Sequence, residues 1–350
     1  MQQDTTDPVQ RHAAPGAAPE SQGSFEETGN AYFPASYVRG FLNFIRDRPA
    51  DISVLTYHQF PWVDGDDMAA GYPGEHAAWR KGLASGRFDR TKAHIVLHYD
   101  VDSVPLRTFN LLSAQAHRGL PAAVMIFNRR VDRRHLKATG EVRFTDYEID
   151  DALLKRLEGE GFVVGYHCNA YEQAPFDERR ALEIFDADVR ALRARFNVRI
   201  FSAHGGAAGP DGRNNRDLPM HPAWQHELYW VHNGHTPHFD AGFSDGGHNS
   251  PQRDPARRDL RDFVARLQPG KRYRVLLHPQ YYSEQFFRSR RYSGTPWYDQ
   301  VIAMAEQGQH EGLWSEVRLG APRSVMKARY LGARKLLGRI KRRFLTGRAD

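Results

Sequence analysis

Four short apolar runs, each ending at Asp or His, constrain this 350-residue chain more than any other feature. The runs are AHIVLHYDVD (93–102), GFVVGYH (161–167), RIFSAHGG (199–206) and YRVLLHP (273–279). Each has the length and composition of a buried β-strand, and the sequence between them carries helical patterns. Strands that alternate with helices predict an α/β fold built on a mostly parallel sheet, closed or nearly closed.

The remaining sequence predicts further helices and strands that continue this alternation. The clearest helix is expected over 177–196, where apolar side chains recur every three or four residues. A charged loop follows the strand at 122–127, and a long loop rich in glycine, histidine and aromatic residues spans 205–250. The other expected elements are helices at 37–45, 105–118, about 150–160 and 255–267, and strands at 51–57 and 227–231.

The ionisable residues at the strand ends are Asp100, Asp102, His167, His204 and His278. Because the carboxyl ends of parallel strands share one face, we expect these side chains to meet. One carboxylate with two imidazoles is a typical open metal site, and a second carboxylate with a third imidazole supplies an acid/base pair. Singly, each residue is better explained as a hydrogen-bonded structural side chain, and the Asp pair as a turn. Their combination at four strand ends favours a site.

Composition predicts a soluble, cytoplasmic protein. The single cysteine, Cys168, excludes an internal disulfide and suits a reducing compartment. The first thirty residues lack the pattern of a secretory signal, and no apolar stretch approaches the roughly 20 residues of a membrane span. We expect a disordered segment at 1–33, one α/β domain at 34–320 and a basic tail at 321–350.

The net charge of +7 belongs to the tail, because residues 317–349 hold eleven Lys and Arg and no acid. The rest of the chain is net acidic, so nucleic acid is not an expected partner. Residues 323–344 read as an amphipathic basic helix, which predicts contact with an anionic membrane at its inner face. A tail that packs its apolar stripe on the core, or one that binds RNA, remains an alternative.

The ordered strand-end motifs resemble those of the polysaccharide deacetylase family, also called the NodB-homology or carbohydrate esterase family 4 group. The resemblance covers residues 93–281 and is strongest to members with an H/Y-D-V-D motif, a G-x-H motif and a terminal L-x-H-P. It implies a distorted (β/α) barrel. It also implies that Asp100 is the catalytic base, that Asp102 and His167 are metal ligands and that His278 is the acid.

Two departures from the better-known family pattern affect the site. A second histidine ligand normally follows the first by four residues, and Tyr171 stands there. We predict that His204 takes this role, as the H-D-V-D subgroup suggests, around a divalent ion with zinc favoured. The third motif, R-x-P-Y, is absent, so family substrate contacts do not transfer. Candidate substrate residues are Tyr171, Trp230 and Asp245, the last in a loop motif similar to that of the subgroup.

The resemblance implies a metal-dependent hydrolase that removes an acetyl group from an N-acetylated sugar or glycan precursor. A cyclic amide or imide hydrolase on the same scaffold is the main alternative, and a non-catalytic glycan-binding relative is another. The presence of Asp100 and His278 argues against mere binding, which needs neither acid nor base. Aromatic residues of the long loop could stack on sugar rings or pack as a lid.

Overall fold

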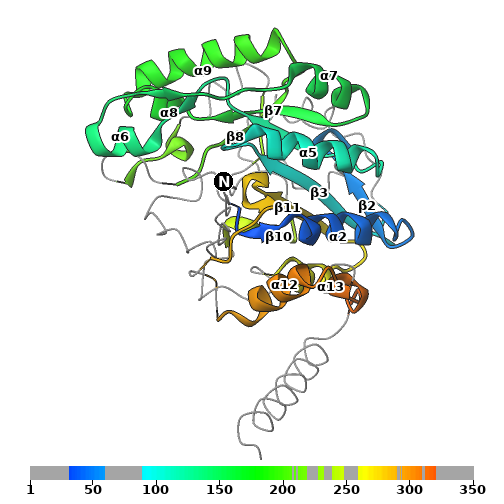
Figure 1. Ribbon diagram of the computed structural model, residues 1–350. Helices are drawn as coiled ribbons and strands as arrows, with labels where there is room; N and C mark the ends of the chain where they lie inside the picture. Colours follow the sequence, from blue (N-terminus) through cyan, green and yellow to red (C-terminus); the bar gives the residue numbers. More distant parts are fainter. Residues whose placement is uncertain are drawn as a thin grey trace, which may run out of the picture.

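The computed structural model describes residues 31–59, 89–206, 209, 212–218, 228–231, 239–247, 259–289, 292, 294–309 and 312–320. The expected tail and most of the expected N-terminal segment lie outside these ranges. Within them, an eight-stranded, wholly parallel sheet curls between helices (Figure 1). The α/β class predicted from the sequence is confirmed, and the curled sheet is consistent with a distorted barrel.

The strand order places the predicted strand ends side by side. Along the sheet the strands are β10 (Ala241–Ser244), β11 (Arg272–Leu277), β3 (Ala93–Asp100), β4 (Ala123–Ile126), β7 (Val163–Cys168), β8 (Ile200–Ala203) and β9 (Tyr229–Trp230), with β2 (Ile52–Leu55) also paired to β3. Since all run in one direction, their carboxyl ends form a common edge, where ligands of parallel sheets bind.

Strand β3 is the centre of the sheet, and every one of its residues is buried. One of its sides pairs with β11 along its length. The other side is divided: β2 pairs with Ala93–Val96, and β4 pairs with His98–Asp100. Asp100 is therefore the last residue of the strand rather than the first residue after it, and the surrounding ladder holds its backbone in place.

The helices begin at the caps that the sequence offers. Asp150 accepts a hydrogen bond from the Leu153 amide at the start of α7, and Asp177 does the same for Arg180 at the start of α9. The helices are α2 (Ala35–Arg46), α5 (Pro105–Ala116), α6 (Arg133–Thr139), α7 (Asp151–Gly159), α8 (Ala170–Gln173), α9 (Glu178–Arg193), α11 (Leu260–Val264), α12 (Pro296–Glu306) and α13 (Gly312–Ser315). Short 3-10 turns are η1 (Tyr57–Gln59), η3 (Asn215–Asp217), η4 (Asp245–Gly247) and η6 (Pro279–Tyr281). The predicted helices and strands are present, with ends shifted by a few residues.

Both faces of the sheet are packed. The helices cover one face over the large apolar core, to which α9 contributes Phe185 beside Tyr166 and Phe201. A smaller cluster that includes Val96, Met125 and Ile200 fills the opposite face. This face admits no extra atom at Gly165, because a Cβ there would lie 2.6 Å from the sulfur of Met125.

The start and the end of the described chain are packed together. Strand β1 (Phe33–Pro34) pairs in parallel with β12 (Tyr282–Ser283), and α2 lies beside α12 and α13 (Figure 1). Ala31 and Phe33 are fully buried. Residues 31–33 therefore belong to the folded part of the chain, and the expected division into an N-terminal segment, a domain and a tail stays a prediction. None of the helices in the described part is long and apolar enough to cross a membrane.

Candidate metal centre

Three of the predicted ligands lie together at the carboxyl edge of the sheet. Asp102 follows β3, His167 lies in β7 and His204 follows β8. Their donor atoms all lie within 4.8 Å of one another, and all three side chains are buried. Oδ1 of Asp102 is 2.9 Å from Nε2 of His167 and 3.8 Å from Nε2 of His204. This buried group can hold a metal ion.

Neighbouring side chains orient both imidazoles toward Asp102. Nδ1 of His167 lies 2.8 Å from Oγ of Ser202, and Nδ1 of His204 lies 3.2 Å from Oε1 of Glu172. Such outer partners commonly orient histidine ligands of a metal. Nε2 of His204 is buried and has no hydrogen-bond partner within the described ranges. A buried nitrogen left open beside a carboxylate fits a divalent cation, and a His₂Asp set leaves room for water or substrate.

Glu172 is a part of the site that the sequence did not reveal. Burial alone would raise the pKa of its carboxyl group, but the His204 imidazole and the Arg133 guanidinium hold that pKa below its ordinary value. In turn, Glu172 outweighs the effect of burial and raises the pKa of His204. Glu172 is the third residue of the four-residue helix α8, too short for any periodic pattern. Its one signal is its position shortly after His167.

Asp100 lies beside this group and is held by a buried chain of side chains. Nε2 of His98 lies 2.8 Å from Oδ1 of Asp100, and the Tyr57 hydroxyl lies 2.8 Å from Nδ1 of His98. Burial by itself would raise the pKa of Asp100, but the imidazoles of His167 and His98 hold it well below the ordinary value. Burial lowers the pKa of His98. The two pKa shifts thus favour the ionised form of Asp100 and the neutral form of His98.

His278, which follows β11, completes the cluster from the other side. Its Nε2 is 3.5 Å from Oδ2 of Asp102 and 3.9 Å from Oδ2 of Asp100. Oδ1 of Asp245 lies 2.5 Å from its Nδ1, and Oδ2 accepts the backbone N–H of His278 at 2.6 Å. Burial alone would lower the pKa of His278, but the nearby carboxylates, Asp245 foremost, raise it well above the ordinary value. The protonated imidazole is favoured.

The predicted substrate residues have other surroundings. The ring of Tyr171 stacks on Phe176, Trp230 packs against Phe201, and Asp245 is bonded to His278. Tyr171, Trp230 and Asp245 are all buried, and their contact with substrate stays a prediction. The long loop's Trp224, His226, His232, His235 and His238 lie outside the described residues, whereas Tyr229 and Phe243 are core residues.

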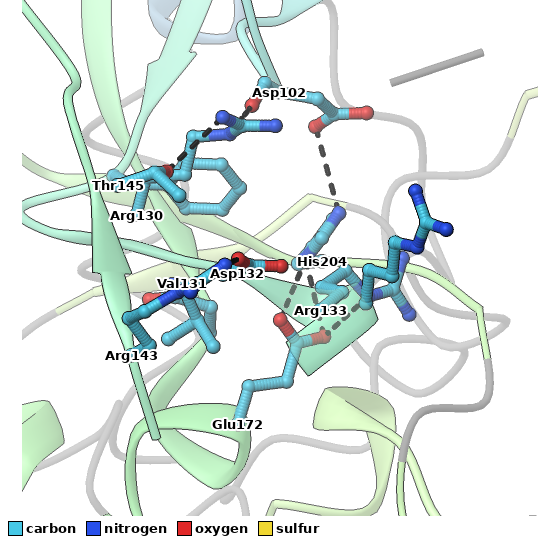
Figure 2. Close-up of a pocket in the computed structure, with 12 residues that line it drawn as sticks. Asp102, Arg130, Val131, Asp132, Arg133, Arg143, Thr145, Glu172 and His204 are labelled. Atoms are coloured by element: carbon cyan, nitrogen blue, oxygen red, sulfur yellow. Dashed lines mark hydrogen bonds and ion pairs between the residues drawn. The ribbon is translucent and has the colours of Figure 1, made fainter. Parts of the chain in front are cut away.

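A cavity of about 260 Å³ adjoins the candidate metal centre (Figure 2). Asp102 and His204 form part of its wall, so an occupant would lie against the ligating atoms. The remaining wall consists of Phe127, Arg130, Val131, Asp132, Arg133, Arg134, Arg143, Thr145, Asn169 and Glu172. The fold and this site define an α/β protein with a buried Asp–His–His group that opens to a polar cavity.

Comparisons with known proteins add little to this description. No protein-family model matches the sequence, and no curated protein matches it. A solved structure of a family 4 carbohydrate esterase from Bacillus anthracis is similar over 63% of this chain and 79% of that chain. The two share 15% sequence identity, with a TM-score of 0.30. A likeness at this level defines neither a family nor an activity.

Proposed function

We propose that the protein is a metal-dependent hydrolase that removes an acetyl group from an N-acetylated sugar or glycan precursor. The observation that carries this proposal is the meeting of Asp102, His167 and His204 with two further groups, Asp100 and His278, at one edge of the sheet. Three ligands for a metal, a base and an acid together suit metal-assisted hydrolysis of an unactivated amide.

Asp102, His167 and His204 would hold a divalent ion, for which zinc is the best match to the donor set. When bound, the ion supplies Lewis-acid polarisation of the acetamide carbonyl. The side chains around it have separate tasks. Glu172 and Ser202 keep the two imidazoles turned toward Asp102.

Asp100 and His278 perform the proton transfers. Oδ1 of Asp100 is engaged by His98, which leaves Oδ2 to take a proton from the attacking water. His278 donates its Nε2 proton to the amine as the C–N bond breaks, while Asp245 stabilises the imidazolium through Nδ1–H. The pKa of Asp100 is lowered and that of His278 is raised, and this opposition supports the assignment of base and acid.

The proposal is tested with the purified full chain. Its metal content and the release of acetate from a panel of N-acetylated saccharides are measured before chelation, after chelation and after zinc is restored. We expect acetate release that follows the zinc content. A cyclic imide in the same panel tests the alternative hydrolase. Turnover of the imide alone, or activity that is indifferent to chelation, contradicts the proposal.

A further inference from the structure

The cavity beside the metal centre is rich in arginine. Arg130, Arg133, Arg134 and Arg143 all line it, and all come from one stretch of chain between β4 and α7. In this stretch β5 (Arg130–Val131) and β6 (Phe144–Thr145) pair as an antiparallel ribbon, and α6 lies between them. One segment, residues 130–143, therefore lines the cavity with positively charged side chains next to the candidate metal centre (Figure 2).

Two of the guanidinium groups are fixed in place by the protein. Arg130 donates from Nε to the backbone oxygen of Asp102 at 2.7 Å and from Nη1 to Oγ1 of Thr145 at 3.1 Å. Arg133 donates from Nη2 to the Gly206 carbonyl at 2.8 Å, and its Nε forms an ion pair with Oε1 of Glu172 at 3.3 Å. A guanidinium has five N–H donors in a rigid fork, so groups held in this way can still bind an incoming anion.

The balance of charge in the wall is positive. Apart from Asp102, which belongs to the ligating group, the lining holds four arginines against two carboxylates, Asp132 and Glu172. Arg143 donates a hydrogen bond from Nε to Oδ2 of Asp132, at the start of α6. Arg134 lines the cavity and is exposed, and it has no hydrogen bond or ion pair within the described ranges of the chain. A cavity that binds only the neutral hydroxyl groups of a sugar does not need this excess of positive charge.

From these observations we propose that the cavity binds an anionic group of the substrate, a carboxylate or a phosphate, next to the scissile acetamide. The inference rests on the proposed function and names its substrate class: acidic N-acetylated sugars, either uronic acids or sugar phosphates. Planar, bidentate pairing with carboxylate or phosphate is the chemistry for which arginine is suited. A volume of about 260 Å³ is enough for a small anionic group such as a carboxylate or a phosphate.

The test compares Arg134→Gln with Lys137→Gln in the metal-loaded full chain. Lys137 is exposed on the same helix and does not line the cavity, so its variant makes the same change of charge elsewhere. Acetate release is measured with an N-acetylhexosamine, its uronic acid and its phosphate. Direct binding of glucuronate, glucose 1-phosphate and glucose is measured by calorimetry. Arg134→Glu and Lys137→Glu repeat the comparison with reversed charge.

We expect a lower KM for at least one of the two acidic substrates than for the neutral one. The substrate with the lower KM shows whether the cavity prefers a carboxylate or a phosphate. Arg134→Gln should raise that KM roughly three- to tenfold relative to the KM of the neutral substrate, with a larger effect for Arg134→Glu. Equal KM values for all three substrates, or equal behaviour of the Arg134 and Lys137 variants, overturns the inference and leaves the hydrolase standing. Anion binding that depends on Arg134 without any turnover overturns the hydrolase instead.

Discussion

Nε2 of His98 lies 2.8 Å from Oδ1 of Asp100, and this contact determines which oxygen of the carboxylate faces the site. Nδ1 of His98 is held in turn by the Tyr57 hydroxyl. With His98 neutral, Tyr57 donates to Nδ1 and Nε2–H donates to Asp100. Oδ2 of Asp100 is then directed toward His278, 3.9 Å from its Nε2. The proposed base, Asp100, is therefore oriented by His98 of β3 and by Tyr57 of η1.

Loss of the Tyr57 hydroxyl should impair this orientation. Tyr57→Phe leaves Nδ1 of the buried His98 without its donor, and we expect kcat to fall roughly tenfold with KM unchanged. Tyr99→Phe is the matched control, because it removes a buried hydroxyl from β3 that bonds to Gln115 instead. Steady-state kinetics and the melting temperature separate the two. If both variants lose the same activity, the effect is merely structural.

Replacement of Asp100 by Asn should abolish the base but spare the ligands. Because general base catalysis contributes about 10²- to 10⁴-fold, we expect kcat of Asp100→Asn to fall by that factor. Metal content, measured by mass spectrometry, should stay at the wild-type level, since Asp102, His167 and His204 are unchanged. Full turnover in Asp100→Asn would show that another group takes the proton.

Removal of one ligand should release the metal. His167→Ala takes away an Nε2 atom 2.9 Å from Asp102, and we expect it to lose both metal and activity. His117→Ala removes an exposed imidazole at the end of α5 and should keep both. Metal retained in His167→Ala at the wild-type stoichiometry would remove His167 from the ligand set.

Asp245 sets the pH range in which His278 is protonated. Its carboxylate raises the pKa of His278, so Asp245→Asn should lower that pKa. A group that must be protonated is lost as pH rises through its pKa, and the alkaline limb of kcat/KM should therefore move to lower pH. The full pH profiles of wild type and variant test this. An unchanged alkaline limb would mean that another group sets it.

Close packing at the ends of the chain predicts a stability effect at Gly40. A Cβ at this helical position would overlap the Trp314 ring, so we expect Gly40→Ala to reduce the free energy of unfolding by about 1–3 kcal/mol. Gly159, in α7, has open space around it, and Gly159→Ala should be neutral or stabilising by up to about 1 kcal/mol. Denaturant unfolding of both variants decides. Equal shifts would contradict the packing argument.

The strands that end at Asp or His could be predicted because each is a short, continuous apolar run, whereas β10 lies in a stretch expected to be loop. The parallel sheet then brings the ends of β3, β7 and β8 together, and His204 lies where a ligand was expected in place of Tyr171. Ligation by these residues stays a prediction. The signal was the combination of ionisable residues at four strand ends, since any one of them alone is better explained as a structural side chain.

The supporting residues could not be predicted, because their roles depend on contacts that no local pattern records. His98 lies inside an apolar run and resembles any core residue until the structure sets it against Asp100. The arginines of 130–143 read only as a charged loop. These arginines line one cavity because β5 pairs with β6. That pairing could not be predicted, since strands of two residues show no periodicity in the sequence.

The pairing of β1 with β12 has a consequence for synthesis on the ribosome. Phe33 and Tyr37 are synthesised well before Tyr282, Trp297 and Trp314, against which they pack. A nascent chain thus carries an uncovered aromatic surface until Tyr282, Trp297 and Trp314 have been synthesised. The segment that covers this surface follows His278, so a chain that stops short of His278 lacks both these packing partners and the proposed acid.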